Sequence, residues 1–192
     1  MSKSKGEFLT VSLLEKKGYD PMAYRLFCLQ SHYRRNLVFS WENLDNAVTA
    51  YDKLIAKIAT VVDGGDVDEE ALGKLKERFM GALNGDLNTS LAVTAVYDVL
   101  KAKCSDATKL AALKDFDQVL SLNLLSAAEN LRKKQAEEEA ANADPEIDAL
   151  VAARTEAKKA KNWAEADRIR DELKAQGIEI IDTPQGAKWR RV

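Results

Sequence analysis

Histidine, cysteine, glycine and proline are scarce in this sequence of 192 residues, and their scarcity excludes several kinds of site. A single histidine, His32, leaves almost no material for a histidine-based metal site or a catalytic triad. The two cysteines, Cys28 and Cys104, form no CxxC pair and have no neighbouring ligand set, which favours buried reduced thiols over a disulfide. We therefore expect no metal site in this chain.

Long apolar runs and excess positive charge are also missing. No segment is apolar enough to predict a membrane span, and the first residues are polar rather than signal-like. The formal net charge is −2, whereas a protein that holds nucleic acid by a diffuse basic surface is usually positive. We expect a cytoplasmic chain without a membrane or DNA partner, in which any contact with RNA is local.

Alanine, leucine, lysine and glutamate dominate instead, and this composition favours helices. Helices are expected to begin near Thr10 or Ser12, at Asp20, Ser40 and Asp68, at Asn88 or Thr89, and at Asp106. The longest carries an apolar stripe from Trp41 to Val62, and the one that begins at Asp106 runs to Leu120. Because no stripe can be buried alone, these segments predict an antiparallel helical bundle.

The pattern changes between Glu129 and Ala143, where charge and alanine replace the apolar stripe and indicate a solvated linker. Beyond it, one helix begins at Pro145, and a second is capped by Asn162 and ended by Gly177. A β-branched run and a Pro-Gly-containing turn then predict a β-hairpin, which must lean on the two helices. The fold class is mainly α, a helical bundle followed by a small α+β module of helical hairpin and β-hairpin.

Four segments together resemble one known family, in the family's order. They are Met1-Ser-Lys-Ser4 with Gly6-Glu-Phe-Leu-Thr10, Ser31-His-Tyr-Arg34 followed by Phe39-Ser40-Trp41, Gly85-Asp-Leu-Asn-Thr89, and the tail from Lys161 to Arg191. The chain is similar to the carboxyl-terminal, tRNA-binding half of bacterial cysteinyl-tRNA synthetases, over nearly its whole length. Its opening residues look like the family's KMSKS loop, without the first lysine.

The resemblance implies a domain division and partners. Residues 1–19 would be the KMSKS-like loop and lead-in, 20–128 an anticodon-binding-type helical bundle, 129–143 a charged linker, and 144–192 an anticodon-recognition module. The implied partners are tRNA for cysteine and a catalytic domain whose HIGH motif and zinc ligands would precede residue 1. ATP and zinc are implied for the intact enzyme, and catalysis by this chain alone is not expected. The alternatives are a stand-alone RNA-binding paralogue and a helical interaction protein.

By resemblance, the KMSKS remnant that would bind ATP comprises Met1, Ser2, Lys3 and Ser4. Lys3 would stabilise charge on the ATP phosphates, because a flexible ammonium on a loop can meet developing negative charge. The alternative for Lys3 is a terminal residue without a role in this chain.

The implied anticodon and tRNA contacts are Lys158, Trp163, Asp167, Asp182, Trp189 and Arg190. Trp163 offers a stacking face beside lysines, or else closes the helical hairpin as a core residue. The two carboxylates suit the donor edges of guanine and cytosine, with an ion pair or a turn role as the alternative. Lys158 stands where many relatives have arginine, which would weaken a bidentate contact.

The remaining candidates are Trp189 and Arg190, which alternate on the last strand, and a second cluster before Ser40. Trp189 is expected to face the helices, leaving Arg190 for a phosphate or a base edge. The second cluster comprises His32, Tyr33 and Arg34, which could touch the inner side of the tRNA L. A basic cluster that complements the dipole at a helix end is the alternative.

Overall fold

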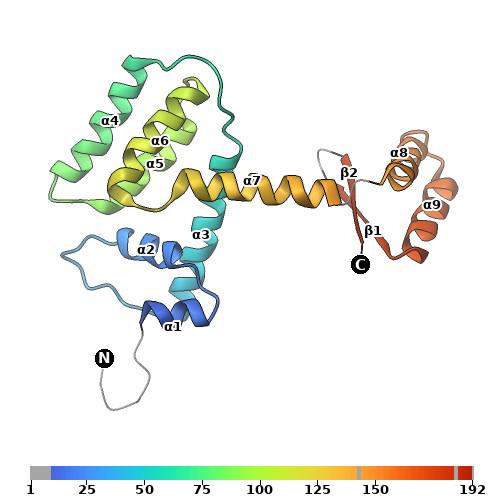
Figure 1. The fold of residues 1–192 in the computed structure, drawn as a ribbon, viewed down its shortest axis with the longest axis horizontal. Coiled ribbons are helices and arrows are strands. Elements are labelled where there is room, and N and C mark those ends of the chain that lie inside the picture. The colour runs from blue at the N-terminus through green and yellow to red at the C-terminus, as the bar shows by residue number, and fades with distance from the viewer. Residues whose placement is uncertain (1–9, 142–143, 184–185, 192) are drawn as a thin grey trace, which may run out of the picture. The chain divides into compact units, whose positions relative to one another are not determined.

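A computed structural model describes residues 10–141, 144–183 and 186–191 and confirms the mainly helical fold class (Figure 1). Within these residues there are nine helices and one two-stranded antiparallel sheet. The helices are α1 (Val11–Lys16), α2 (Pro21–Leu29), α3 (Trp41–Ala59), α4 (Glu69–Asn84), α5 (Thr89–Lys101), α6 (Asp106–Leu120), α7 (Leu124–Ala141), α8 (Pro145–Lys159) and α9 (Trp163–Ala175). The strands are β1 (Ile178–Thr183) and β2 (Gly186–Arg191). The chain divides into two compact units, Met1–Arg132 and Lys133–Val192.

Six helix starts predicted from polar residues are confirmed. In each, a side-chain oxygen accepts a hydrogen bond from a backbone N–H two or three residues further on. These residues are Thr10, Asp20, Ser40, Asp68, Asn88 and Asn162. The helix predicted from Asp106 to Leu120 is confirmed at both ends.

The predicted stripe of the longest helix is wrong at its two ends. The helix α3 ends at Ala59, so Val62 lies beyond it and is 68% exposed. At this helix end, the guanidinium of Arg132 donates to the carbonyls of Ile58, Ala59 and Val61. At the other end, Trp41 is 40% exposed and stacks on Tyr19 instead of entering the core.

The core of the first unit lies among α2 to α6 and the first turns of α7. The stacked rings of Phe79 and Phe116, with centroids 4.0 Å apart, join α4 to α6. Leu122, Leu124 and Ala128 are buried in the same core. The helix α7 therefore begins as part of the bundle, and it runs without a break into the charged segment that the sequence marked as a linker.

The second unit is a helical hairpin covered by the β-hairpin. Its core consists of Ile147, Val151, Ile169, Leu173 and Ile178, with Leu150, Ile180, Ala187 and Trp189 packed against it. The strand β1 contacts α9, and β2 contacts α8. The predicted reliance of the two strands on the two helices is confirmed, because the apolar residues of the sheet pack into the core that the helices form.

Candidate nucleic-acid interface

The tight connection between α8 and α9 presents Trp163 to solvent. Lys161 adopts a left-handed conformation with φ 58°, and Asn162 then caps α9, so Trp163 is the first helical residue. The inward positions of this helix are Ala166, Ile169 and Leu173. Trp163 falls outside that face and is 59% exposed. The alternative of a core tryptophan is therefore wrong, and an open indole face is available for stacking.

One exposed face of α9 continues from this indole. Asp167, Arg170 and Lys174 follow Trp163 at intervals of four, three and four residues, which aligns all four side chains along the helix. All of them are exposed. We call these four residues the α9 stripe. It places an aromatic ring, a carboxylate and two cations in line, which suits unstacked nucleotides and their phosphates.

Asp167 is already engaged in an ion pair. Its Oδ1 lies 3.0 Å from Nη1 of Arg170, and the two side chains are 62% and 52% exposed. The same guanidinium also donates to Asp171 Oδ1 at 3.1 Å. The structure thus shows the ion pair that the sequence left as an alternative to base recognition. The two are compatible, because a carboxylate has four acceptor positions and this one stays open to solvent.

The β-hairpin brings Trp189 and Arg190 to opposite sides, as their alternation predicts. Trp189 pairs with Ile180 across the strands, packs on the core, and donates from Nε1 to Oδ1 of Asp148 at 2.7 Å. Arg190 faces Glu179 across the strands and donates from Nε to its Oε2 at 2.7 Å. Trp189 therefore fixes the hairpin to α8, whereas Arg190 is 61% exposed and available to a ligand.

A groove joins the α9 stripe to the hairpin. It has a volume of about 750 Å³ and is lined by Arg170 and Lys174 from α9, and by Ile178, Ile180 and Arg190 from the strands. Three cations surround an aliphatic floor, together with Glu179, which pairs with Arg190. The sequence did not single out Arg170 as a site residue or Lys174 at all, although the helical spacing from Trp163 could have identified both.

Lys158 and Asp182 are the two remaining residues of the predicted anticodon and tRNA contacts. Lys158 lies in the last turn of α8 and is half-buried. The backbone of Asp182 pairs with Ala187 near the end of β1. The side chain of Asp182 lies outside the described residues, so its place relative to Trp163 and Asp167 stays a prediction.

A second candidate surface in the first unit joins two of the segments that carried the family resemblance. Asp86, in a left-handed turn after α4 with φ 65°, meets the loop after α2. Tyr33 donates its hydroxyl to Asp86 Oδ1 at 2.7 Å, and Arg34 Nε lies 2.7 Å from Asp86 Oδ2. The ring of His32 stacks on Tyr33, with centroids 4.9 Å apart. We call these four residues the Asp86 cluster.

The Asp86 cluster holds an aromatic ring and a guanidinium at the surface. The hydrogen bond from Tyr33, and then that from Arg34, lowers the pKa of the Asp86 carboxyl. Tyr33 remains 60% exposed although its hydroxyl is fixed, and Arg34 lies over its ring. The helix α2 ends at Leu29, so these residues belong to a loop held by a carboxylate rather than to a helix end. The sequence missed Asp86 because the contact spans 53 residues.

A family model over the second unit and relatives over nearly the whole chain give the same family. Residues 140–190, which include α9 and most of the hairpin, match the family model of the cysteinyl-tRNA ligase anticodon binding domain. The chain is 41% identical over 199 residues to the cysteine–tRNA ligase of Novosphingobium aromaticivorans, covering 99% of this chain and 40% of that protein. It is 40% identical over 205 residues to the cysteine–tRNA ligase of Methylococcus capsulatus, covering 100% of this chain and 43% of that protein.

The chain belongs to the cysteine–tRNA ligase family. It corresponds to the carboxyl-terminal part of these proteins, as the resemblance implied. It spans about two fifths of the length of the curated relatives, 40% in one and 43% in another. The tRNA partner and the aminoacylation reaction that the resemblance implied are properties of a whole ligase, and for this chain they are proposals.

A KMSKS loop and a zinc site are expected of a whole cysteine–tRNA ligase. The residues resembling the KMSKS loop, Met1 to Ser4, lie outside the described residues. Among residues 10–141, 144–183 and 186–191, no three His, Cys, Asp or Glu side chains are grouped to hold a metal ion, so these residues do not fit a zinc site. In the same part of the chain, no helix is long and apolar enough to cross a membrane.

Proposed function

We propose that this chain recognises tRNA for cysteine as the anticodon-reading part of a cysteine–tRNA ligase. The observation that carries the proposal is the α9 stripe, which lies inside the segment that matches the anticodon binding domain. The family match supports the partner, and the stripe supplies the chemistry that such a partner requires. Residues 144–192 would read the anticodon, and residues 20–128 would support the rest of the tRNA.

In the proposed recognition, the residues of the α9 stripe have different roles. An anticodon base would stack on the open indole of Trp163, because every base has a π-face. The Asp167 carboxylate would accept hydrogen bonds from a guanine or cytosine edge, which offers N–H donors there. Arg170, Lys174 and Arg190 would neutralise phosphates along the groove. Lys158 and Asp182 complete the proposed contact set.

The Asp86 cluster is the proposed second contact of the same tRNA. Its exposed tyrosine ring and guanidinium can stack on a ribose or base and pair with a phosphate. Because Asp86 already fixes both groups, little side-chain entropy would be lost on binding. This contact would add affinity without reading the anticodon.

Aminoacylation, ATP and zinc belong in this proposal to the whole ligase. Met1 to Ser4 would meet ATP only together with the nucleotide-binding part of the enzyme. The cytoplasm is the proposed location, because translation takes place there.

The experiment compares two carboxylates of α9 that share one arginine. Asp167→Asn and Asp171→Asn each remove an ion pair with Arg170, but only Asp167 lies on the stripe with Trp163. Binding is measured to tRNA for cysteine with its native anticodon and with each anticodon base replaced. Asp167→Asn is expected to lose roughly 1–3 kcal/mol of discrimination for the native anticodon, the range for a base-edge contact.

Asp171→Asn should retain that discrimination, and Trp163→Ala should weaken every tRNA. Asp182→Asn tests in the same series whether its carboxylate acts with Asp167. The proposal fails if the wild type binds tRNA for cysteine no more tightly than other tRNAs. It also fails if Asp167→Asn and Asp171→Asn behave alike while both remain folded.

A further inference from the structure

A cavity of about 340 Å³ lies in the first unit, where the ends of α3 and α5 meet the start of α6. Three lysines line it, one from each helix: Lys57, Lys101 and Lys109. Tyr97, Thr60 and Asp106 also face it. None of these residues belongs to the α9 stripe or to the Asp86 cluster, so the proposed tRNA contacts leave this cavity without a role.

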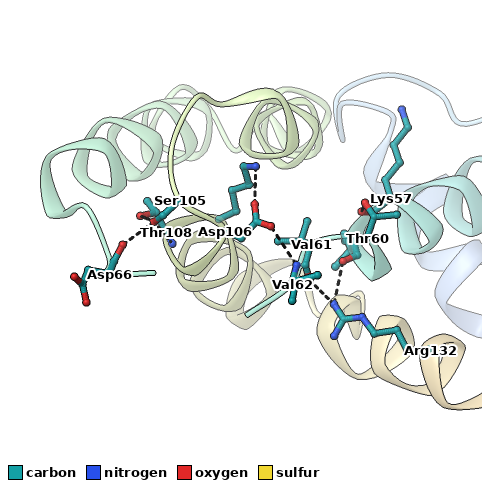
Figure 2. A network of polar contacts seen from close by, with 11 residues as sticks. Lys57, Thr60, Val61, Val62, Asp66, Ser105, Asp106, Thr108 and Arg132 are labelled. Atoms are coloured by element: carbon teal, nitrogen blue, oxygen red, sulfur yellow. Dashed lines mark hydrogen bonds and ion pairs between the residues drawn. The ribbon is translucent and has the colours of Figure 1, made fainter. Parts of the chain in front are cut away.

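The cavity carries an excess of positive charge. Lys109, with 17% of its side chain exposed, is held by Asp106 at 2.8 Å. The other oxygen of Asp106 accepts from the N–H of Val62 at 3.2 Å, so each oxygen of this carboxylate already has one partner (Figure 2). Lys57 and Lys101 have no carboxylate partner among the described residues. Three ammonium groups thus face one carboxylate, in a chain whose formal net charge is −2.

Capping of the α3 helix does not explain the position of Lys57. Lys57 lies in the last turn of α3, where a cation complements the helix dipole. The carbonyls at that end are already taken by the guanidinium of Arg132, through contacts to Ala59 at 2.8 Å and Val61 at 2.6 Å. Figure 2 shows Arg132 against the end of α3 and the side chain of Lys57 extending away from it. Lys57 lines the cavity, and capping of α3 does not require its ammonium group.

Tyr97 adds an uncharged donor to the same wall. Its hydroxyl has no hydrogen-bond partner among the described residues, and burial raises its pKa. The hydroxyl therefore stays protonated and can donate. Lysines from three helices and a hydroxyl donor line the cavity, and its one carboxylate is already paired. Ammonium groups and a hydroxyl are the donors that a phosphate group requires.

We propose that this cavity binds a phosphate group, held by Lys57, Lys101 and the Tyr97 hydroxyl. Lys57 and Lys101 are exposed at the rim, whereas Lys109 lies in the wall. The phosphate can therefore belong to an RNA backbone that passes over the rim or to a free polyphosphate. Both sources share the same chemistry, and the experiment separates them.

The test uses the full chain with two double variants of equal charge. Lys57→Gln/Lys101→Gln removes the two rim cations, and Lys53→Gln/Lys114→Gln removes two exposed lysines of α3 and α6 that do not line the cavity. Wild type and both variants are titrated with sodium tripolyphosphate, followed by the amide resonances of Val61, Lys101 and Asp106. Their affinities for tRNA for cysteine are measured in parallel, and thermal unfolding confirms that each variant is folded.

We expect the cavity variant to weaken binding about tenfold or more, the size of losing charge-assisted hydrogen bonds, and the control variant to have less than about a twofold effect. A loss seen only with tRNA assigns the phosphate to an RNA backbone, and a loss seen with tripolyphosphate alone assigns it to a free polyphosphate. Equal weakening in both variants, or no response of the cavity amides and no loss of tRNA affinity, overturns the proposal. The tripolyphosphate arm does not involve the anticodon surface, so its result is independent of the proposed function.

Discussion

At the scale of single residues, carboxylates in this protein act mainly by fixing other side chains. Asp86 holds Tyr33 and Arg34, Asp148 receives the indole N–H of Trp189, and Glu179 receives Arg190. Each of these contacts links segments at least eleven residues apart. The groups that they fix are aromatic or cationic, which are the groups that contact nucleic acid.

The first prediction concerns the pKa of Asp86, whose ordinary value is 3.8 and which the folded protein lowers. Its stabilising contribution is complete above that ordinary value and is lost as the pH falls through the lower pKa of the folded chain. Tyr33→Phe removes the largest cause and should raise the Asp86 pKa, as measured by NMR titration of its carboxyl carbon. Tyr19→Phe removes a similar bond to Asp45 and should leave the Asp86 pKa unchanged. An Asp86 pKa that is the same in wild type and Tyr33→Phe would contradict the cluster.

The second prediction concerns Tyr51, which is buried in the core of the first unit and donates to the carbonyl of Leu122 at 2.8 Å. Tyr51→Phe should destabilise the fold by about 1–3 kcal/mol, because it leaves a buried carbonyl without a donor. Tyr97→Phe is the control, since its hydroxyl has no such partner among the described residues. Urea unfolding measures both. Equal stability of Tyr51→Phe and wild type would show that water replaces the lost donor.

At the scale of secondary structure elements, helix ends decide where loops lie. Polar caps start most helices locally, whereas the end of α3 is covered by a residue 73 positions away. Arg132 covers the end of α3 from α7, and Asp117 of α6 accepts from the N–H groups of Leu122 and Leu124 as the chain enters α7. The helix α7 is thereby attached at its first turns to α3 and α6.

The third prediction concerns Arg132. Arg132→Met should destabilise the first unit by about 1 kcal/mol, because exposed carbonyls regain water in part. Arg132→Lys should recover only part of this loss, since one ammonium cannot reproduce the planar fork. Lys134→Met, which removes a charge from the same helix, should be nearly neutral. Thermal unfolding measures the series, and a Lys134 variant as unstable as the Arg132 variant would contradict the role of the guanidinium in capping α3.

At the scale of the whole molecule, two compact units are joined through α7. The apolar residues of this helix that enter a core lie in its first turns, at Leu124, Ala128 and Leu131. From residue 133 to residue 143 the sequence consists mainly of charged residues and alanine, and the second unit forms its own small core. We infer that residues 133–143 connect units that open independently, and that residues 129–132 of the predicted linker belong to the first unit.

The fourth prediction follows from this connection. Limited proteolysis should cut first between residues 133 and 143, because the side chains of residues 133–138 are exposed and a helix segment without buried contacts opens locally at low cost. Mass spectrometry of the first fragments gives the position. An initial cut inside α3, whose apolar residues are buried, would show that the first unit is less stable than its connection to the second.

The sequence by itself determined the elements whose signals are local. Capping side chains, helical periodicity and the Pro-Gly-containing turn depend on neighbouring residues, so six helix starts and the hairpin were predictable. The family resemblance rested likewise on short contiguous segments. The alignment of Trp163 with Asp167 was also predictable, because four residues make about one helical turn.

Only the tertiary structure decided which side chains meet across long separations. The contact of Asp86 with Tyr33, the contact of Arg132 with the end of α3, and the burial of the first turns of α7 all join residues more than fifty positions apart or depend on such a contact. The cavity lined by Lys57, Lys101 and Lys109 needs three helix ends to converge. No local pattern encodes that convergence, since it results from how the apolar faces of separate helices pack together.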